Sequence, residues 1–262
     1  MSDNLSLQGK VALVTGSGRG IGAGMARAFA EAGADVALTA RTATDIEAVA
    51  AEIRAMGRRA IAVTTDVSDL GQLPGLIDRT VSELGGLDIL VNNAGGAHPS
   101  PTFADTTVEL IESTFRLQVS ASFELARLAL PHMLKRPGAS IINILSPGSY
   151  KAPRGNLAYY VSKAALSHMT KLMAADLGPK IRVNAIIPGP IETPALLELM
   201  KERPEVRQAA AAAVRMRRIG LPADVGAAGV FLASSGASFI TGALLPVDGG
   251  EVQEPRPVSP DL

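Results

Sequence analysis

Short apolar runs alternate with longer segments of helical periodicity along most of the chain. The runs are rich in β-branched residues and mostly apolar on both faces, which is typical of strands buried on both sides. Seven runs are predicted as strands, at residues 10–15, 35–40, 60–65, 88–92, 140–145, 181–187 and 243–247. Because helical segments separate them, the pattern predicts an α/β fold with a doubly wound, seven-stranded parallel sheet and helices on both faces.

The segments between the strands carry apolar residues at helical spacing, and two of them end at a capping glycine, Gly33 or Gly57. Helices are predicted at residues 21–32, 45–56, 72–84 and 157–177, and a long helical region ends near residue 135. Segment 190–218 interrupts the alternation of strands and helices and contains Pro194 and Pro204 within a helical composition, so we expect a mobile substrate lid there. Residues 1–250 are predicted to form a single domain, followed by an irregular C-terminal tail at 251–262.

The charge balance narrows the classes of partner. The chain has 25 Lys and Arg residues against 25 Asp and Glu, with no basic block, which argues against nucleic acid or an anionic membrane as partner. No apolar run reaches the ~18 residues of a membrane span, and no export leader is visible. The absence of Cys agrees with a cytoplasmic enzyme. His98, His132 and His168 lack ligand spacing, so no metal site is expected.

The first predicted strand runs into the sequence TGSGRGIG at residues 15–22, and a helix follows at once. Glycines allow close approach to a pyrophosphate, and a helix N-terminus attracts anions. One register places a G-x-G-x-x-A motif at Gly18, two residues beyond the strand end. The other places T-G-x-x-x-G-x-G directly on the strand end, and we prefer it. The predicted phosphate-binding residues are Gly16, Ser17, Arg19, Gly20, Ile21 and Gly22.

The end of the second strand bears on which nicotinamide dinucleotide binds. A carboxylate there would hold the ribose 2′-hydroxyl of NAD(H), but Asp35 lies at the wrong end and Asp45 in the next helix. Arg41 follows the strand directly, and together with Arg19 it favours the 2′-phosphate of NADP(H). NADP(H) is therefore the preferred cofactor, with NAD(H) as the alternative.

Other strand ends carry small or polar residues at the same predicted sheet edge. Asp66 could accept a hydrogen bond from adenine or cap the following helix, and Thr193 could bond a carboxamide or cap a helix. The predicted cofactor contacts at these ends are Asp66, Val67, Asn93, Ala94, Gly95, Pro188, Gly189, Ile191 and Thr193.

The segment AYYVSKAA at residues 158–165 sets Tyr159 four residues before Lys163, on one face of a helix. A cation ~4 Å from a phenol, at an effective dielectric of ~20, supplies the roughly 3–4 kcal/mol that would bring a Tyr pKa from ~10 toward neutrality. An amphipathic surface pair is the other interpretation. Tyr160 has Ala164 four residues on, and Pro153 prevents a helical pair after Tyr150.

Two further features surround this pair. Ser146 follows the fifth strand at the predicted ligand edge, so its hydroxyl is expected to polarise a substrate oxygen while Tyr159 transfers the proton. The stripe of the same helix that is expected to be buried consists of Val161, Ala165, Met169 and Leu172.

Taken together, these motifs make the sequence similar to the single-domain short-chain dehydrogenase/reductase superfamily. The matching segments are TGSGRGIG (15–22), DV (66–67), NNAG (92–95), Ser146, YYVSK (159–163), RVNAIIPGPIET (182–193) and TGALLPVDGG (241–250). The resemblance implies a Rossmann-type oxidoreductase that interconverts a secondary alcohol and a ketone by hydride transfer. It implies Tyr159 as acid/base, Lys163 lowering its pKa and bonding the nicotinamide ribose, and Ser146 orienting the carbonyl. It also implies Asp66 near adenine, Asn92 near the adenosine ribose, and a homotetramer or homodimer.

One departure from the family concerns a helix where relatives carry an Asn that holds a proton-relay water beside the lysine. This chain has Gln118 at that position, in the stretch that begins Gln118-Val-Ser-Ala-Ser-Phe123. Gln118 is retained as a catalytic candidate. The departure motivates an alternative function, a nucleotide-binding sensor or scaffold with little turnover. A third reading is an epimerase or dehydratase that uses its cofactor only transiently.

Overall fold

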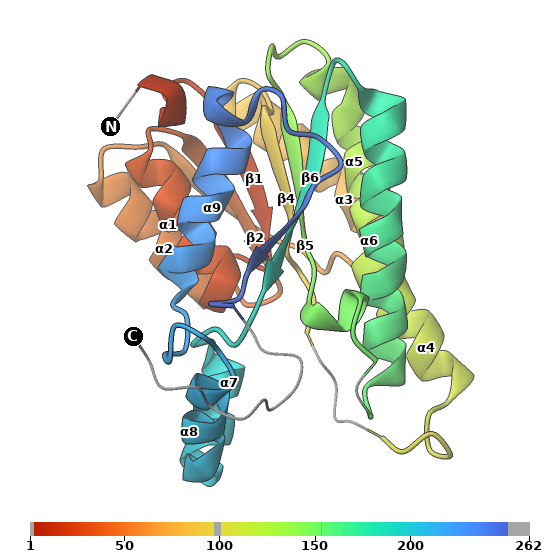
Figure 1. Ribbon diagram of the computed structural model, residues 1–262. Coiled ribbons are helices and arrows are strands. Elements are labelled where there is room, and N and C mark those ends of the chain that lie inside the picture. Colours follow the sequence, from red (N-terminus) through yellow and green to blue (C-terminus); the bar gives the residue numbers. More distant parts are fainter. Residues whose placement is uncertain (1–2, 97–100, 153, 251–262) are drawn as a thin grey trace.

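The computed structural model describes residues 3–96, 101–152 and 154–250, so the predicted tail at 251–262 and His98 lie outside the described residues. Within them the strands form a seven-stranded sheet in the order β3-β2-β1-β4-β5-β6-β7, in which every neighbouring pair is parallel (Figure 1). The strands are β1 (Val11–Thr15), β2 (Asp35–Ala40), β3 (Ala60–Thr64), β4 (Ile89–Asn92), β5 (Ser140–Ile144), β6 (Arg182–Pro188) and β7 (Leu244–Val247).

The predicted strands agree with these bounds to within one residue at each end. The agreement has a simple cause, because central strands such as β1 and β5 are buried along their whole length. A strand covered on both faces must be apolar throughout, so its limits are visible in the sequence. The edge strand β7 is only partly buried.

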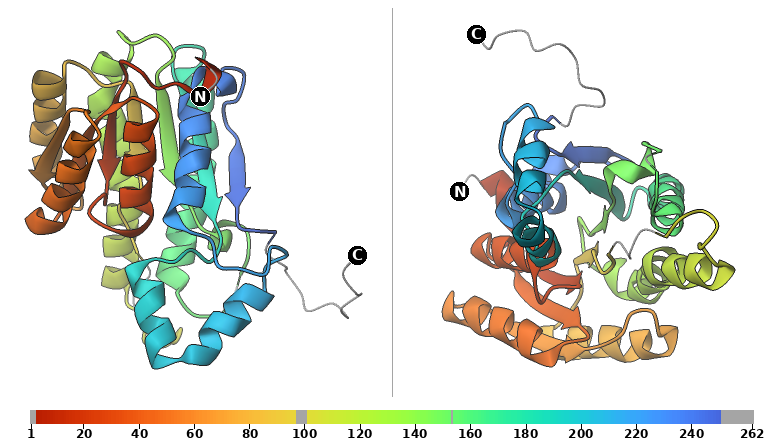
Figure 2. Two further views of the ribbon diagram at one scale, coloured as in Figure 1. Left: turned by 90° about the vertical axis from the view of Figure 1, so that its left-hand side faces the viewer. Right: turned by 90° about the horizontal axis from the view of Figure 1, so that it is seen from below.

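Helices cover the sheet in two layers (Figures 1 and 2). One core cluster joins the sheet to α1 (Gly20–Glu31), α2 (Ala43–Ala55) and α9 (Pro222–Ala233). The other joins the opposite face to α3 (Leu73–Leu84), α5 (Ala121–Met133) and α6 (Leu157–Leu177). The doubly wound architecture with helices on both faces is therefore confirmed.

Shorter elements complete the chain. Helix α4 (Val108–Phe115) continues into α5 through a π-helical segment, η3 (Arg116–Ser120). Segment 190–218 forms α7 (Pro194–Glu202) and α8 (Pro204–Ala212), which project from the sheet edge where the strands end (Figure 2). Its mobility stays a prediction. The remaining turns are 3₁₀ helices, η1 (Asp3–Leu5), η2 (Leu70–Gln72), η4 (Pro147–Ser149) and η5 (Ser235–Ala237).

The sequence-based prediction of which residues are buried on α6 is wrong in part. Val161 is 49% exposed and Leu172 is 54% exposed. The buried face instead contains polar and charged positions such as Ser162, Lys163 and Thr170. Periodicity misassigned the face because α6 carries apolar residues on two sides, one against the sheet and one facing outward.

Among the described residues, no helix is both long enough and apolar enough to cross a membrane.

Candidate active site

The site is centred between β1 and β4, where the strand order reverses in the sheet. Ligands of open parallel sheets bind outside the carboxyl ends of the strands at such a point. The glycine-rich loop follows β1 there, residues 93–95 follow β4, and Ser146 follows β5.

The glycine-rich loop presents backbone rather than side chains. Gly16 has φ +63 and Gly20 has φ +55, conformations that residues with a Cβ rarely adopt. A Cβ on Gly16 would lie 3.0 Å from the Cα of Ala94, so that position is closed to any larger residue. The geometry favours the register Gly16, Gly20 and Gly22, and it fits the pyrophosphate of a dinucleotide.

Thr15 joins the glycine loop to the residues after β4, a function that the sequence reasoning missed. Its hydroxyl donates to Val91 O at 3.1 Å and accepts from the backbone N–H groups of Asn93 and Ala94, both at 2.9 Å. The Asn93 side chain donates to Thr15 O at 2.8 Å. Its position as the last residue before the glycines was the available signal.

Two residues predicted near the cofactor turn their side chains inward, so any contact that they make with it is through the backbone. Ser17 is fully buried, and its hydroxyl accepts from Thr39 N at 2.9 Å, so that hydroxyl ties β1 to β2. Asn92 donates to Asn143 Oδ1 at 2.9 Å inside the sheet, so its side chain does not reach a ribose at the edge. In both cases a buried polar group takes the nearest internal partner.

The residues that bear on NADP(H) or NAD(H) lie on the surface of the same edge. Arg19 and Arg41 are exposed, and Arg41 helps to hold the pKa of Asp66 below its usual value, after the hydrogen bond from Ser68. Asp66 Oδ1 accepts from Ser68 N at 2.9 Å and so closes a local turn, whereas the residue that caps the following 3₁₀ helix is Asp69. A Cβ on Gly18 would lie 2.7 Å from the Cβ of Asp45, so a carboxylate-bearing residue is near the loop as well.

Residues after β6 also reach the glycine loop. A Cβ on Gly20 would lie 3.3 Å from the Cγ2 of Thr193, so the two segments are in contact range. The Thr193 hydroxyl accepts from Leu196 N at 3.3 Å and caps α7. Gly189 packs against Asp248, while Ile191 and Val67 are each 5% exposed.

Tyr159 and Ser146 lie at the same edge of the sheet, near enough for the serine to affect the pKa of the phenol. Ser146 begins the turn η4 after β5, and Tyr159 lies in the first turns of α6. Burial raises the pKa of the Tyr159 phenol, and the side-chain hydrogen bond with Ser146 opposes that rise. Burial, which the helical spacing does not reveal, therefore outweighs the opposing effects on the Tyr159 phenol, and the lowering of its pKa by Lys163 stays a prediction.

Lys163 lies beneath the ring of Tyr159, with its ammonium 5.6 Å from the ring centroid, as the i, i+4 spacing predicts. The ammonium donates to Ile144 O at 2.8 Å, and burial lowers the pKa of Lys163 from 10.5 to about 8. Such a residue can change its charge close to physiological pH. The surface-pair interpretation is excluded, since Lys163 is only 5% exposed.

Gln118 lies inside the π-helical segment, which sequence periodicity could not predict. Its side chain is 1% exposed, and Nε2 is 3.4 Å from Gly96 O. Its Oε1 is a buried acceptor without a partner among the described atoms. The amide packs against Gly95 at the end of β4, where a Cβ would meet Gln118 Cγ at 3.5 Å. π-Helical turns recur at functional sites.

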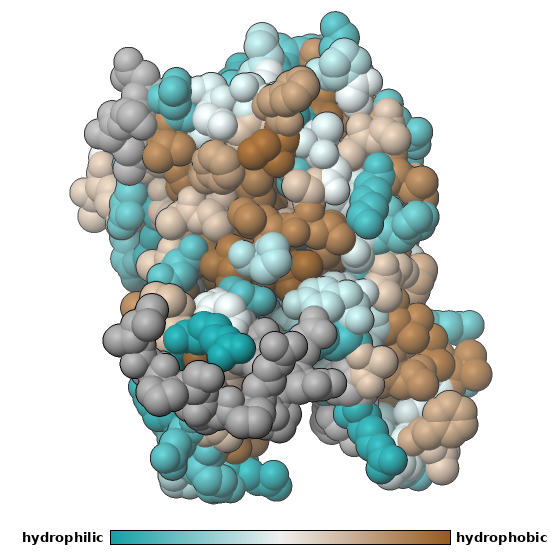
Figure 3. Space-filling model, in the orientation of Figure 1, coloured by the Kyte–Doolittle hydropathy of each residue, from teal (hydrophilic) through white to brown (hydrophobic). Residues whose placement is uncertain are grey.

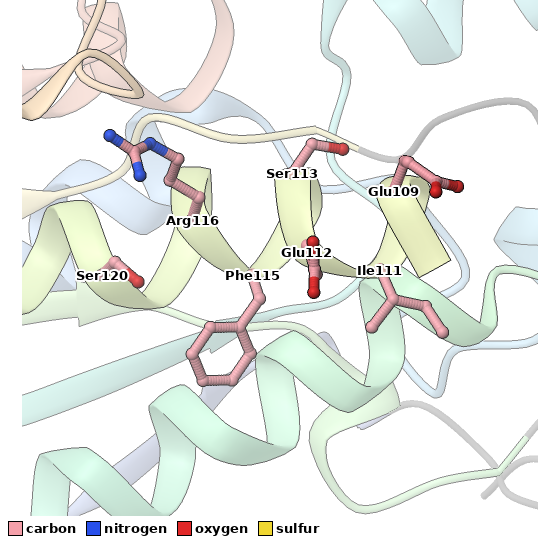
Figure 4. A pocket seen from close by; sticks show the side chains of 7 residues that line it. All are labelled: Glu109, Ile111, Glu112, Ser113, Phe115, Arg116 and Ser120. Atoms are coloured by element: carbon pink, nitrogen blue, oxygen red, sulfur yellow. The ribbon is translucent and has the colours of Figure 1, made fainter. Parts of the chain in front are cut away.

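A separate hollow lies along α4 and contains none of the predicted site residues (Figure 4). In the close view, Phe115 and Ile111 point toward the neighbouring helix, and Arg116 points away from it. The hollow is lined by Glu109, Ile111, Glu112, Ser113, Phe115, Arg116 and Ser120.

Known proteins are similar to this chain in sequence and in fold. A family model described as enoyl-(acyl carrier protein) reductase matches residues 16–251. The 7α-hydroxysteroid dehydrogenase of Escherichia coli (strain K12) is 41% identical over 254 residues, which cover 97% of this chain and 98% of the relative.

Two solved structures extend the likeness to three dimensions. A 7α-hydroxysteroid dehydrogenase complexed with NADH and 7-oxo glycochenodeoxycholic acid has a TM-score of 0.91 at 42% identity, covering 97% of this chain and 98% of that one. A crystal structure described as an NAD(P)-dependent gluconate 5-dehydrogenase from Beutenbergia cavernae, with bound NADP, has a TM-score of 0.87 at 32% identity. The match covers 94% of this chain and 98% of that one.

The chain therefore belongs to the short-chain dehydrogenase/reductase superfamily. It is an NAD(P)(H)-dependent oxidoreductase that interconverts a secondary alcohol and a ketone.

Proposed function

We propose that Tyr159 exchanges the proton and Ser146 polarises the substrate oxygen in this reaction. The observation that carries the proposal is the placement of the Tyr159 ring over the buried Lys163 ammonium, 5.6 Å away, at the carboxyl edge of the sheet where Ser146 follows β5. The Ser146 hydroxyl also influences the pKa of Tyr159, so the two hydroxyls are near enough for both to contact one substrate oxygen.

Each direction of the reaction uses a different state of Tyr159. When bound, the nicotinamide dinucleotide supplies the ring that gives or takes the hydride. In ketone reduction, Ser146 donates a hydrogen bond to the carbonyl oxygen, and Tyr159 donates its proton to that oxygen. In alcohol oxidation, the Tyr159 phenolate takes the hydroxyl proton. Burial raises the pKa of Tyr159 further above neutrality, so near pH 7 the phenol carries the proton that ketone reduction requires.

Lys163 contributes a charge that is held close to the reacting proton. Its ammonium lies under the Tyr159 ring, and a positive charge there stabilises the phenolate when it forms. With a pKa of about 8, Lys163 is mostly protonated at neutral pH and can still release a proton in turnover. The bond to Ile144 O fixes the position of the amine.

A preference for NADP(H) follows from the two exposed arginines. Arg41 lies directly after β2, and Arg19 is the N-cap residue of α1, so both can approach a 2′-phosphate. Asp45 and Asp66 lie nearby and weaken the positive potential, so we expect the preference to be moderate.

Gln118 is proposed to support turnover rather than abolish it. Its buried Oε1 has no partner among the described atoms, so it is available to accept from a water molecule or a cofactor hydroxyl. This arrangement argues against the sensor or scaffold alternative, which rests on the change from Asn to Gln.

The experiment that tests the function is a screen of secondary alcohols and ketones, followed through the absorbance of the reduced nicotinamide. Hydroxysteroids and their oxo forms enter first, because a relative of that activity is 41% identical over nearly the whole chain. A substrate-dependent change in absorbance supports the oxidoreductase. Binding of dinucleotide without any turnover supports the sensor, and product without net change in absorbance supports an epimerase or dehydratase.

A homo-oligomer is the proposed assembly. Apolar side chains are exposed on α4, α5 and α6, including Phe115, Phe123 and Leu172. Figure 3 shows a second gathering of apolar side chains over the middle of the face that carries the edge strand β7. Exposed apolar patches of this kind mark interfaces. Light scattering on the purified protein distinguishes a tetramer or dimer from a monomer.

A further inference from the structure

The ring of Tyr160 occupies the space that a side chain on Gly148 would need. A Cβ built on Gly148 would overlap the Cδ1 and Cε1 atoms of that ring and lie 2.8 Å from its Cγ. Gly148 does not have a left-handed φ, so its backbone conformation alone does not require glycine. The glycine is required by the ring of Tyr160.

Gly148 is also the residue that holds the catalytic serine. Its backbone N–H donates to Ser146 Oγ at 3.3 Å. The turn is further closed by Ser149 N, which donates to Ser146 O at 2.9 Å. Gly148 is buried, and η4 packs against α6 (Figure 1). A ring seated on Gly148 therefore limits where the Ser146 hydroxyl can move.

The same ring touches the other catalytic hydroxyl-bearing residue. The rings of Tyr159 and Tyr160 pack edge to face, with centroids 5.6 Å apart and an interplanar angle of 65°. Edge-to-face pairs contribute about 0.5–1.5 kcal/mol beyond the area that they bury. Tyr160 thus contacts the helix side of the site through Tyr159 and the strand side through Gly148.

We propose that Tyr160 is a positioning residue, whose ring braces the Ser146 turn against Tyr159 and so fixes the distance between the two reacting hydroxyls. The inference rests on the proposed function of Ser146 and Tyr159. The phenol oxygen of Tyr160 has no part in it, because the contacts are made by ring carbons.

The test is a double-mutant cycle on kcat for the substrate found in the screen, with Tyr160→Ala, Ser146→Ala and the double variant. Removing one donor to a reacting oxygen costs about 10²-fold or more in kcat, so we expect about that loss for Ser146→Ala and at least about tenfold for Tyr160→Ala. If Tyr160 acts through Ser146, the double variant stays within about threefold of Ser146→Ala, since groups that act as a unit are not additive.

Tyr160→Phe is the matched control, because it keeps the ring and removes only the hydroxyl. It should retain kcat within about threefold of the wild type, as expected when ring packing carries the effect. The dissociation constant of the cofactor should stay unchanged in every variant. A general loss of folding would instead lower the melting temperature and weaken cofactor binding together.

Gly148→Ala approaches the same contact from the other side and remains informative if Tyr160→Ala fails to fold. It should lower kcat in the wild type and have little effect in a Tyr160→Leu background, where the ring is gone. If the wild type is active and the losses of Ser146→Ala and Tyr160→Ala are fully additive, the positioning of Ser146 by Tyr160 is overturned, while the proposed function is unaffected. A wild type that transfers no hydride to or from any substrate overturns the proposed function, and this inference falls with it.

Discussion

The amine of Lys163 donates a hydrogen bond to the carbonyl oxygen of Ile144 at 2.8 Å, two residues before Ser146. Ile144 is the last residue of β5, so this bond joins α6, which carries Tyr159, to the strand that precedes Ser146. Burying an ammonium here has an energetic cost, which is visible in its depressed pKa of about 8. The arrangement predicts a conflict between stability and activity.

Replacing Lys163 by Met should abolish turnover and relieve this cost. The folded-state pKa of about 8 lies below the unfolded value of 10.5, so the unfolded state binds more protons between these pH values. Stability of the wild type is therefore reduced by about 3 kcal/mol below pH 8 and recovers as pH rises toward 10.5. Lys163→Met lacks this dependence, although it also loses the bond to Ile144.

The measurement is the free energy of unfolding of both proteins at pH 6.5 and pH 9. The wild type should gain about 1 kcal/mol relative to Lys163→Met between the two values. Lys171→Met, at an exposed position of the same helix, is the control and should show no such change. If the free energies of unfolding of the wild type and Lys163→Met differed by the same amount at both pH values, the pKa of the Lys163 amine would not be lowered in the folded protein.

Ser146→Ala should move the pH dependence of alcohol oxidation. The hydrogen bond from Ser146 opposes the rise in the pKa of Tyr159, so its removal raises that pKa further. Oxidation needs the phenolate, and its rate should therefore reach half its maximum at a higher pH than in the wild type. The pH profile of kcat for oxidation checks this. A midpoint at the same or a lower pH in Ser146→Ala would mean that Ser146 does not lower the pKa of Tyr159.

Arg41→Ala should weaken the binding of NADPH more than that of NADH. Loss of a charged partner to the 2′-phosphate is expected to cost about 1.5–3 kcal/mol, or roughly tenfold or more in affinity. Fluorescence titration with both cofactors measures the ratio of the dissociation constants. Arg79→Ala, on the exposed face of α3, is the control. A wild type that binds NADH more than tenfold tighter would overturn the NADP(H) preference.

Gln118→Met should separate the catalytic use of the amide from its packing. Met has a similar length and places no unpaired acceptor where Oε1 lies, so the variant should be about as stable as the wild type or up to about 1–2 kcal/mol more stable. We expect kcat to fall, because a partner that accepts hydrogen bonds beside the site is lost. Equal kcat would assign Gln118 to packing alone, and Gln118→Asn shows whether the shorter amide suffices.

The sequence predicted the parts of the molecule in which a residue's environment follows from its neighbours in the chain. Strand limits were visible because buried strands are apolar throughout, and the pair Tyr159 and Lys163 was visible because helical spacing fixes adjacency. The register of the glycine loop was visible because Gly16 directly follows a strand.

Features that depend on the third dimension were not predictable in this way. The π-helical turn at Gln118 leaves no periodic signal, and the outward apolar face of α6 looks like a core face. The rise in the pKa of Tyr159 on burial was not predictable, because helical spacing identifies the nearby charge of Lys163 and says nothing of desolvation. Thr15 was missed because its partners after β4 are distant in sequence.

The most direct test of the central claim is single-turnover hydride transfer by Tyr159→Phe, with cofactor binding measured on the same protein. The variant keeps the ring over Lys163 and beside Tyr160 and removes the one exchangeable proton. The account predicts cofactor affinity within about twofold of the wild type and a loss of transfer of about 10²–10⁴-fold, the range of general acid–base catalysis. Transfer within about threefold of the wild type would contradict it, since the proton would then come from another group.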